Sequence, residues 1–282
     1  MTAATVSPSS AKVKFRLAGG AQPLILLPVY VNNRGPFEFI LDTGAGTSLL
    51  SSELPKELDV KIAGSKEGHG AGGRIAVSLA KVDSLAVGEM RLENVDVAIV
   101  DLISIGTAVG AKIDGDIGYN FLKHFRLTVN YRDSTIRLDD PKRTESFATG
   151  VKTEVPIRLA NSAKPLILVD VRANGRGPFQ FAIDTGTSTS AVTPELAEAL
   201  GLTTSEIPPI TAGGGRIQAS AATLQSLQLG GAKIDNAAVV VADFFTILNA
   251  VVGAKLEGIV GYNFLRNYKV VVDYPRERLT LF

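Results

Sequence analysis

The sequence predicts a mainly β protein of two homologous lobes, and two observations lead to this fold class. The first is an internal repeat: residues 35–44 return as residues 177–186, so that Asp42 matches Asp184 at an offset of 142 residues. The second is the alternation of apolar and polar residues inside each copy, which is typical of half-buried strands. Solenoid repeats are roughly 20–50 residues long, so each copy is a whole lobe rather than a stacked unit.

The repeat extends over most of the chain. The further matching pairs are 23–26 with 165–168, 72–75 with 214–217, and 118–122 with 261–265. The last pair has an offset of 143, which is one residue more than the others. A duplicated lobe with a slightly altered loop accounts for this difference.

Within each lobe the sequence predicts short strands and few helices. The strands expected in the first lobe are 12–17, 25–31, 37–41, 95–100 and 127–131. Thr193, Pro194 and Glu195 predict a short helix with a cap, a first-turn proline and a first-turn acid, and Gly201 ends it. Residues 51–58 are the weaker counterpart of this helix in the first lobe.

A polar segment that contains Pro141 and Gly150 predicts the boundary between the lobes. The predicted organisation is a flexible N-terminus at 1–11, a first lobe at 12–140, a linker at 141–153 and a second lobe at 154–282. Each lobe is of ordinary domain size.

Composition excludes several classes of function. Lys and Arg number 29 against 28 Asp and Glu, so no basic surface is expected for nucleic acid. Without Cys there is no disulfide or thiolate metal site, and His69 and His124 are too few for a histidine metal centre. We therefore expect no metal and no cofactor.

No apolar run approaches the roughly 20 residues of a membrane-spanning helix, so no transmembrane segment is expected. Residues 1–11 lack the charged start and apolar stretch of a signal peptide. The expectation is a soluble protein, cytoplasmic if the chain is complete and periplasmic or secreted if a leader was removed.

The motif that carries chemistry is Asp-Thr-Gly after an apolar strand, and it occurs once in each lobe, at 42–44 and 184–186. Together with the later apolar-Gly segments at 117–118 and 260–261, it resembles the aspartic peptidases. The lobes are similar to those of the retropepsin type, and their tandem arrangement resembles that of pepsin. The resemblance implies two acid-protease-type β-barrel lobes related by a pseudo-two-fold axis, with a catalytic pair formed by Asp42 and Asp184.

Two nearby carboxylates suit peptide hydrolysis because like charges a few ångströms apart share one proton. One member then activates water as a base while the other protonates the carbonyl oxygen. The resemblance implies supporting roles for residues beside the pair. The threonines, Thr43 and Thr185, reach across to the other lobe, and Gly44 and Gly186 allow the loops to approach.

The residue after each motif differs, being Ala45 in the first lobe and Thr187 in the second. In the aspartic peptidases a hydroxyl at this place can donate a hydrogen bond to the catalytic carboxylate, which favours its charged form, and the resemblance implies this role for Thr187. We therefore expect Asp184 to be the more readily ionised member and Asp42 the more often protonated one.

Glycine-rich runs about 30 residues beyond each aspartate resemble flaps that cover substrate. The flap residues implied by this resemblance are Gly70, Ala71, Gly72 and Gly73 in the first lobe, and Gly213, Gly214 and Gly215 in the second. His69 is interpreted as a solvated loop residue. The expected partner is an extended peptide or protein substrate.

One position departs from the family pattern. The first lobe has Asp116 before Ile117-Gly118, where the second lobe has the apolar Ile259. A buried charge there needs a partner. The side chain is expected either to face solvent or to pair with Lys112 or Lys123.

The sequence thus predicts a monomeric aspartic endopeptidase, and three alternatives remain open. Each lobe could pair with its counterpart in a homodimer, which would give two symmetric sites. The chain could be a catalytically silent module of the same fold that binds peptides. It could also be a precursor that trims its own N-terminus.

Overall fold

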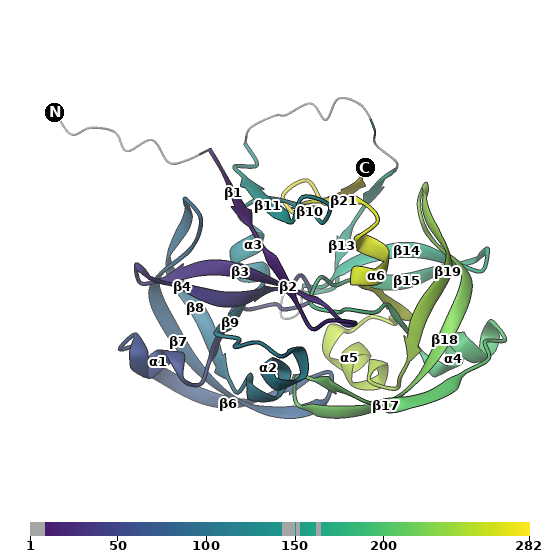
Figure 1. Ribbon diagram of the computed structural model, residues 1–282, viewed down its shortest axis with the longest axis horizontal. Coiled ribbons are helices and arrows are strands. Elements are labelled where there is room, and N and C mark those ends of the chain that lie inside the picture. Colours follow the sequence, from purple (N-terminus) through teal and green to yellow (C-terminus); the bar gives the residue numbers. More distant parts are fainter. Residues whose placement is uncertain (1–8, 143–149, 151–152, 162–164) are drawn as a thin grey trace.

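The computed structural model describes residues 9–142, 150, 153–161 and 165–282, and it is mainly β with six short helices in these ranges. Its strands form three sheets, two of eight strands and one of six. Figure 1 shows two lobes side by side, with the six-stranded sheet lying between them on one side of the molecule. The two-lobed, mainly β fold predicted from the repeat is confirmed.

Each eight-stranded sheet belongs to one lobe, and both have the same strand order. In the first lobe the order is β2 (Arg16–Ala18), β3 (Leu24–Val31), β4 (Arg34–Leu41), β9 (Gly115–Ile117), β5 (Leu49–Ser51), β8 (Met90–Val100), β7 (Gly73–Val87) and β6 (Ile62–Gly70). In the second it is β13 (Arg158–Leu159), β14 (Ile167–Ala173), β15 (Arg176–Ile183), β20 (Gly258–Val260), β16 (Ala191–Val192), β19 (Ala232–Val241), β18 (Gly215–Leu229) and β17 (Ser205–Ala212). The sequence repeat is therefore also a repeat of topology.

The six-stranded sheet joins the lobes and was not predicted from the sequence. Its order is β1 (Ser10–Lys14), β11 (Thr135–Asp139), β10 (Arg126–Asn130), β21 (Lys269–Asp273), β22 (Arg278–Leu281) and β12 (Thr153–Pro156). At its centre β10 and β21 pair antiparallel, with Arg126 opposite Asp273. Backbone hydrogen bonds thus connect the two lobes directly.

The predicted strands agree with the structure except at the start of the first lobe. The expected strand 12–17 is divided into β1 and β2 at Phe15, a buried residue that lies between the six-stranded sheet and the first lobe's own sheet. β1 begins at Ser10, two residues before the predicted start of the lobe. Most of the predicted linker 141–153 and residues 1–8 of the predicted N-terminus lie outside the described residues.

The predicted second-lobe helix is α4 (Pro194–Ala199), and its cap is as expected. The Thr193 hydroxyl accepts the Leu196 N–H at 3.0 Å, which satisfies one of the free donors at the helix start. Its counterpart is α1 (Leu54–Glu57). The other helices, α2 (Ile103–Val109), α3 (Tyr119–Leu122), α5 (Phe245–Val252) and α6 (Tyr262–Leu265), were not predicted.

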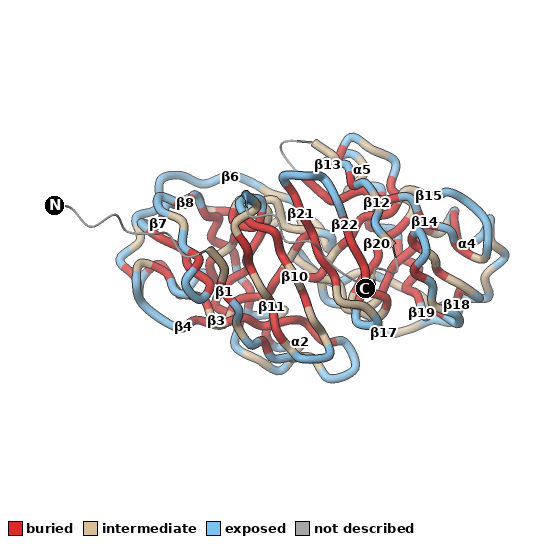
Figure 2. The backbone as a smooth tube through the Cα atoms, turned by 90° about the horizontal axis from the view of Figure 1, so that it is seen from above, coloured by how far each residue is buried: buried red, intermediate tan, exposed pale blue. Residues whose placement is uncertain are grey.

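The largest hydrophobic cluster runs through both lobes and the sheet between them, and it includes the fully buried rings of Phe39, Phe121, Phe181 and Phe264. Figure 2 shows buried residues along the central strands β10, β21 and β22. Because this core is shared, the lobes are held against one another by apolar packing as well as by strand pairing. Among the described residues, no helix has the length and apolar character needed to cross a membrane.

Candidate active site

Asp42 and Asp184 occupy equivalent places, each directly after a central strand of its lobe. Asp42 follows β4, and its N–H donates to the Ile117 carbonyl of β9 at 3.1 Å. Asp184 follows β15, and its N–H donates to the Val260 carbonyl of β20 at 3.1 Å. The apolar-Gly segment of each lobe therefore fixes the backbone from which the carboxylate projects.

The structure brings the two carboxylates together across the boundary between the lobes. A Cβ atom placed on Gly44 would lie 2.7 Å from the carboxylate of Asp184. A Cβ atom on Gly186 would lie 2.6 Å from the Cγ of Asp42. Both distances are below van der Waals contact, so only glycine leaves room for the opposite carboxylate.

Both carboxylates accept hydrogen bonds from their own loops. The Gly44 and Ala45 N–H groups donate to Asp42 Oδ1 at 2.6 and 3.0 Å. The Gly186 N–H donates to Asp184 Oδ1 at 2.7 Å. The Thr187 hydroxyl donates to Asp184 Oδ2 at 2.8 Å, as the sequence predicted.

The structure opposes the expectation that Asp184 is readily ionised. Burial and the charge of Asp42 raise the pKa of Asp184 to about 8 from an ordinary value of 3.8. The hydrogen bonds from Thr187 and Gly186 act in the opposite direction but are outweighed. Removal of a carboxylate from water beside a like charge disfavours ionisation more than one hydroxyl favours it. Asp184 therefore retains its proton up to neutral pH.

The two threonines of the motifs connect the loops symmetrically. The Thr43 N–H donates to the Thr185 hydroxyl and the Thr185 N–H donates to the Thr43 hydroxyl, both at 3.1 Å. The Thr43 hydroxyl in turn donates to the Ile183 carbonyl at 3.1 Å, and the Thr185 hydroxyl to the Leu41 carbonyl at 2.8 Å. These buried hydrogen bonds fix the separation of the two aspartates.

A second pair of polar contacts supports each loop and was missed in the sequence. In the first lobe, the Ser48 N–H and hydroxyl both contact Asn120 Oδ1, at 2.7 and 2.9 Å, and the Gly118 N–H donates to the Ser48 hydroxyl at 3.0 Å. Ser190 and Asn263 repeat the arrangement in the second lobe. The repeat could have indicated these contacts, because Ser48 and Asn120 recur as Ser190 and Asn263.

The predicted flap residues form the ends of two hairpins, β6–β7 and β17–β18, which approach each other (Figure 1). The Gly72 N–H donates to the Gly213 carbonyl at 2.8 Å. A Cβ atom on Gly70 would overlap the same carbonyl group. The two flap tips, residues 70–73 and 213–215, are therefore joined, while His69 beside them is exposed.

Asp116 does not face solvent, since its exposed fraction is only 4%. It lies on β9 opposite Ile40 and Leu49, in the middle of the first lobe's sheet. Lys112 forms its ion pair with the neighbouring Asp114, at 2.7 Å, and the Lys123 ammonium lies over the ring of Tyr119. Of the two alternatives considered for Asp116, exposure to solvent is therefore wrong.

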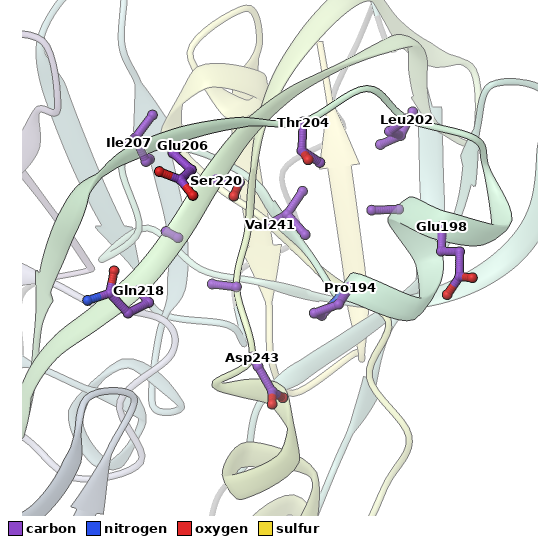
Figure 3. Close-up of a pocket in the computed structure, with 13 residues that line it drawn as sticks. Pro194, Glu198, Leu202, Thr204, Glu206, Ile207, Gln218, Ser220, Val241 and Asp243 are labelled. Atoms are coloured by element: carbon purple, nitrogen blue, oxygen red, sulfur yellow. The ribbon is translucent and has the colours of Figure 1, made fainter.

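An open groove of about 690 Å³ lies on the second lobe (Figure 3). It is lined by α4, by the base of the β17–β18 hairpin and by the end of β19, and it includes the acidic side chains of Glu198, Glu206 and Asp243. None of the predicted site residues lines it. The groove is thus separate from the aspartate pair.

Comparison with known protein families gives a direct result. The aspartyl protease family model matches the chain twice, at residues 27–121 and 169–264. Each match spans one Asp-Thr-Gly motif and the later glycine segment of the same lobe. A search of curated proteins finds no match. The two family matches together cover more than half of the sequence, and the chain belongs to the aspartyl protease family, with the family domain present twice.

Proposed function

We propose that this protein is an aspartic endopeptidase in which Asp42 and Asp184 form one catalytic dyad. The observation that carries the proposal is the approach of each carboxylate to the glycine of the opposite motif, where an added Cβ atom would lie only 2.7 or 2.6 Å from it. Two carboxyl groups this close together share a proton, so that an acid and a base are present together.

The reaction begins with a water molecule held between the two carboxyl groups. Ionised Asp42 removes a proton from this water as its oxygen attacks the carbonyl carbon of the peptide bond. Asp184, whose pKa is raised to about 8, donates its proton to the carbonyl oxygen. The product of this step is a neutral gem-diol.

In the second step Asp42 passes its proton to the amide nitrogen while a gem-diol hydroxyl returns a proton to Asp184. The C–N bond then breaks and releases a carboxylic acid and an amine, which restores the initial state of the dyad. Because the two groups titrate as a pair, this assignment of acid and base describes one microstate of the dyad.

The joined flap tips support an extended peptide as substrate. They belong to two hairpins, one from each lobe, and extended peptides bind through backbone hydrogen bonds with alternate side chains in pockets. The hydrogen bond between Gly72 and Gly213 holds the two tips together. We therefore expect the flap tips to separate when substrate enters.

The arrangement of the lobes favours a monomer over a homodimer with two symmetric sites. The pairing of β10 with β21 and the Thr43–Thr185 hydrogen bonds join the two motif loops within a single chain, which supports one site per chain. A dimer would have to break this shared sheet or exchange a lobe. A peptide-binding module without turnover remains the second candidate, because the same fold could bind peptides if hydrolysis were absent.

The experiment is digestion of an unfolded protein mixture at pH 3 to 7 by wild type, Asp42→Asn and Asp184→Asn. We expect fragments with wild type alone. The matched control is Asp235→Asn, which removes a charge from an exposed ion pair with Lys233 and should cleave normally. Binding of a statine-type inhibitor by wild type without any cleavage would instead favour the peptide-binding module.

A further inference from the structure

Four tyrosines form a layer between the dyad loops and the sheet that joins the lobes. Tyr119 and Tyr262 are the first residues of α3 and α6. Tyr131 and Tyr274 directly follow β10 and β21, the two central strands of the six-stranded sheet. Tyr119 of the first lobe matches Tyr262 of the second, and Tyr131 matches Tyr274, both at the offset of 143 residues found in the sequence.

The tyrosines contact one another across the lobe boundary. The rings of Tyr119 and Tyr274 pack edge to face with centroids 5.4 Å apart, and those of Tyr131 and Tyr262 do so at 5.5 Å. Such contacts are favourable in this geometry. Each tyrosine of the six-stranded sheet is therefore placed against a tyrosine of the opposite lobe.

This layer is connected to the catalytic loops by backbone hydrogen bonds. The Tyr119 N–H donates to the Ala45 carbonyl at 2.8 Å, and the Tyr262 N–H donates to the Thr187 carbonyl at 2.8 Å. Both acceptors lie three residues after a catalytic aspartate. The positions of Tyr131 and Tyr274 are thus set by the same loops that set the dyad.

The hydroxyl groups of Tyr131 and Tyr274 are buried and have no hydrogen-bond partner among the described residues. A buried polar group without a partner destabilises the fold, and hydroxyls at such depth are usually bridged by an ordered water. Burial raises the pKa of both phenols, and the charge of Asp184 raises both further, with Asp42 also acting on Tyr274. Both phenols therefore remain neutral donors while the dyad titrates.

The other charged groups around this layer already have partners. Lys123 and Arg266 lie over the rings of Tyr119 and Tyr262, each 5.6 Å from the centroid. On the six-stranded sheet, Arg126 pairs with Asp139, and Arg276 pairs with Asp273. These charges are therefore engaged beside the layer, while the Tyr131 and Tyr274 hydroxyls are buried within it.

We propose that Tyr131 and Tyr274 are positioning residues of the dyad, whose neutral hydroxyls stabilise its single negative charge from the side opposite the flaps. A donor that favours the charged form lowers the pKa at which the dyad ionises. The two lobes contribute one hydroxyl each, and a buried water links each hydroxyl to the carboxylates. The inference rests on the proposed function, since it assigns these residues a part in that same site.

The test is the pH profile of kcat/KM for Tyr131→Phe, Tyr274→Phe and the double variant. Loss of the donors should move the whole profile to higher pH, by about half a pH unit or more in the double variant. Tyr268→Phe is the matched control, because its half-exposed hydroxyl donates to the Lys233 carbonyl at 2.9 Å, away from the dyad. Thermal unfolding of each variant checks that it is folded, so that a shift of the pH profile reports the lost hydroxyl and not loss of structure.

A profile of the folded double variant that overlays wild type would overturn the proposal, because a purely structural role leaves the dyad's titration unchanged. Titration of the aspartate carboxyl carbons by NMR, with labelled aspartate, gives the same comparison without turnover. If wild type cleaves no peptide, the proposed function fails, and the NMR titration still decides the role of the two tyrosines. Dyad signals that titrate at the same pH in both proteins would refute that role.

Discussion

The Thr43 and Thr185 hydroxyls each accept the other residue's N–H at 3.1 Å, and each also donates to a carbonyl of the opposite lobe. Four hydrogen bonds thus join two threonines and two strand ends at the centre of the molecule. Since all of them are buried, their loss leaves backbone groups without partners. The geometry of the aspartate pair depends on this connection.

We expect Thr43→Val and Thr185→Val to lower both stability and activity. Valine keeps the shape of threonine but leaves a buried N–H and a buried carbonyl unpaired, at a cost of about 1–3 kcal/mol for each group. Urea unfolding measures the stability change, and kcat/KM the activity. Thr43→Ser retains the hydroxyl and should stay close to wild type. A valine variant with unchanged stability would show that these hydrogen bonds do not hold the lobes together.

Gly44→Ala and Gly186→Ala should abolish activity. The added Cβ would lie 2.7 or 2.6 Å from the opposite aspartate and would force the two carboxyl groups apart. Peptidase assays of the purified variants measure the effect. In Gly64→Ala the added Cβ meets no atom within 4 Å, so this control should remain active. Normal turnover by either motif variant would contradict the close approach of the carboxylates.

The flap tips should also be sensitive to added volume. In Gly70→Val the side chain would overlap the Gly213 carbonyl and prevent the tips from joining. We expect a raised KM for a peptide substrate with little change in thermal stability, because the tips lie outside the hydrophobic clusters. Steady-state kinetics separate the two parameters. An unchanged KM would mean that the joined tips do not take part in binding.

The raised pKa of Asp184 predicts a dependence of stability on pH. Between the ordinary value of 3.8 and about 8, the folded protein binds a proton that the unfolded chain has lost. The free energy of unfolding should therefore fall as pH rises through this range. Asp184→Asn removes the titrating group, so its stability should change less between pH 4 and 8 and exceed that of wild type at pH 8. If the free energies of unfolding of wild type and Asp184→Asn changed in parallel with pH, the raised pKa of Asp184 would be contradicted.

Thr187→Ala should shift the activity profile. The lost hydroxyl hydrogen bond favours the charged form of Asp184, so its removal raises the pKa of that carboxyl further. The alkaline limb of kcat/KM should move to higher pH, and the variant should retain activity near pH 5. Thr187→Ser keeps the donor and should reproduce the wild-type limb. An alkaline limb that does not move in the alanine variant would contradict this role.

The repeat was sufficient to predict the lobes and to single out Asp42 and Asp184, because duplicated motifs mark positions that two lobes bring to one boundary. It did not predict the six-stranded sheet, whose pairs such as Arg126 and Asp273 are distant in sequence and carry no local signal. Helices α2 and α5 were missed because they are short and lack side-chain caps. The sequence does indicate where these helices end, because each is followed by a glycine, Gly110 or Gly253, that adopts a positive φ.

The ionisation of Asp184 was predicted in the wrong direction because the sequence shows a hydroxyl donor but not the depth of burial. The Thr187 hydrogen bond was visible as a residue difference, whereas the desolvation of the pair depends on the packing of both lobes. Asp116 is a similar case, since its burial follows from the position of β9 inside the sheet. Electrostatic predictions therefore need the fold, whereas the proposal of Asp42 and Asp184 as the catalytic pair needed only the repeated motif.

The most direct test of a single intramolecular dyad is kcat/KM for Asp42→Asn and Asp184→Asn, each compared with wild type under identical conditions. Our account predicts that each substitution alone lowers kcat/KM by at least about a thousandfold, because catalytic groups that act as a unit fail together. If the sites instead formed between two chains, each variant would keep one intact pair and about half of the wild-type activity. Retention of that activity by either variant would contradict the account.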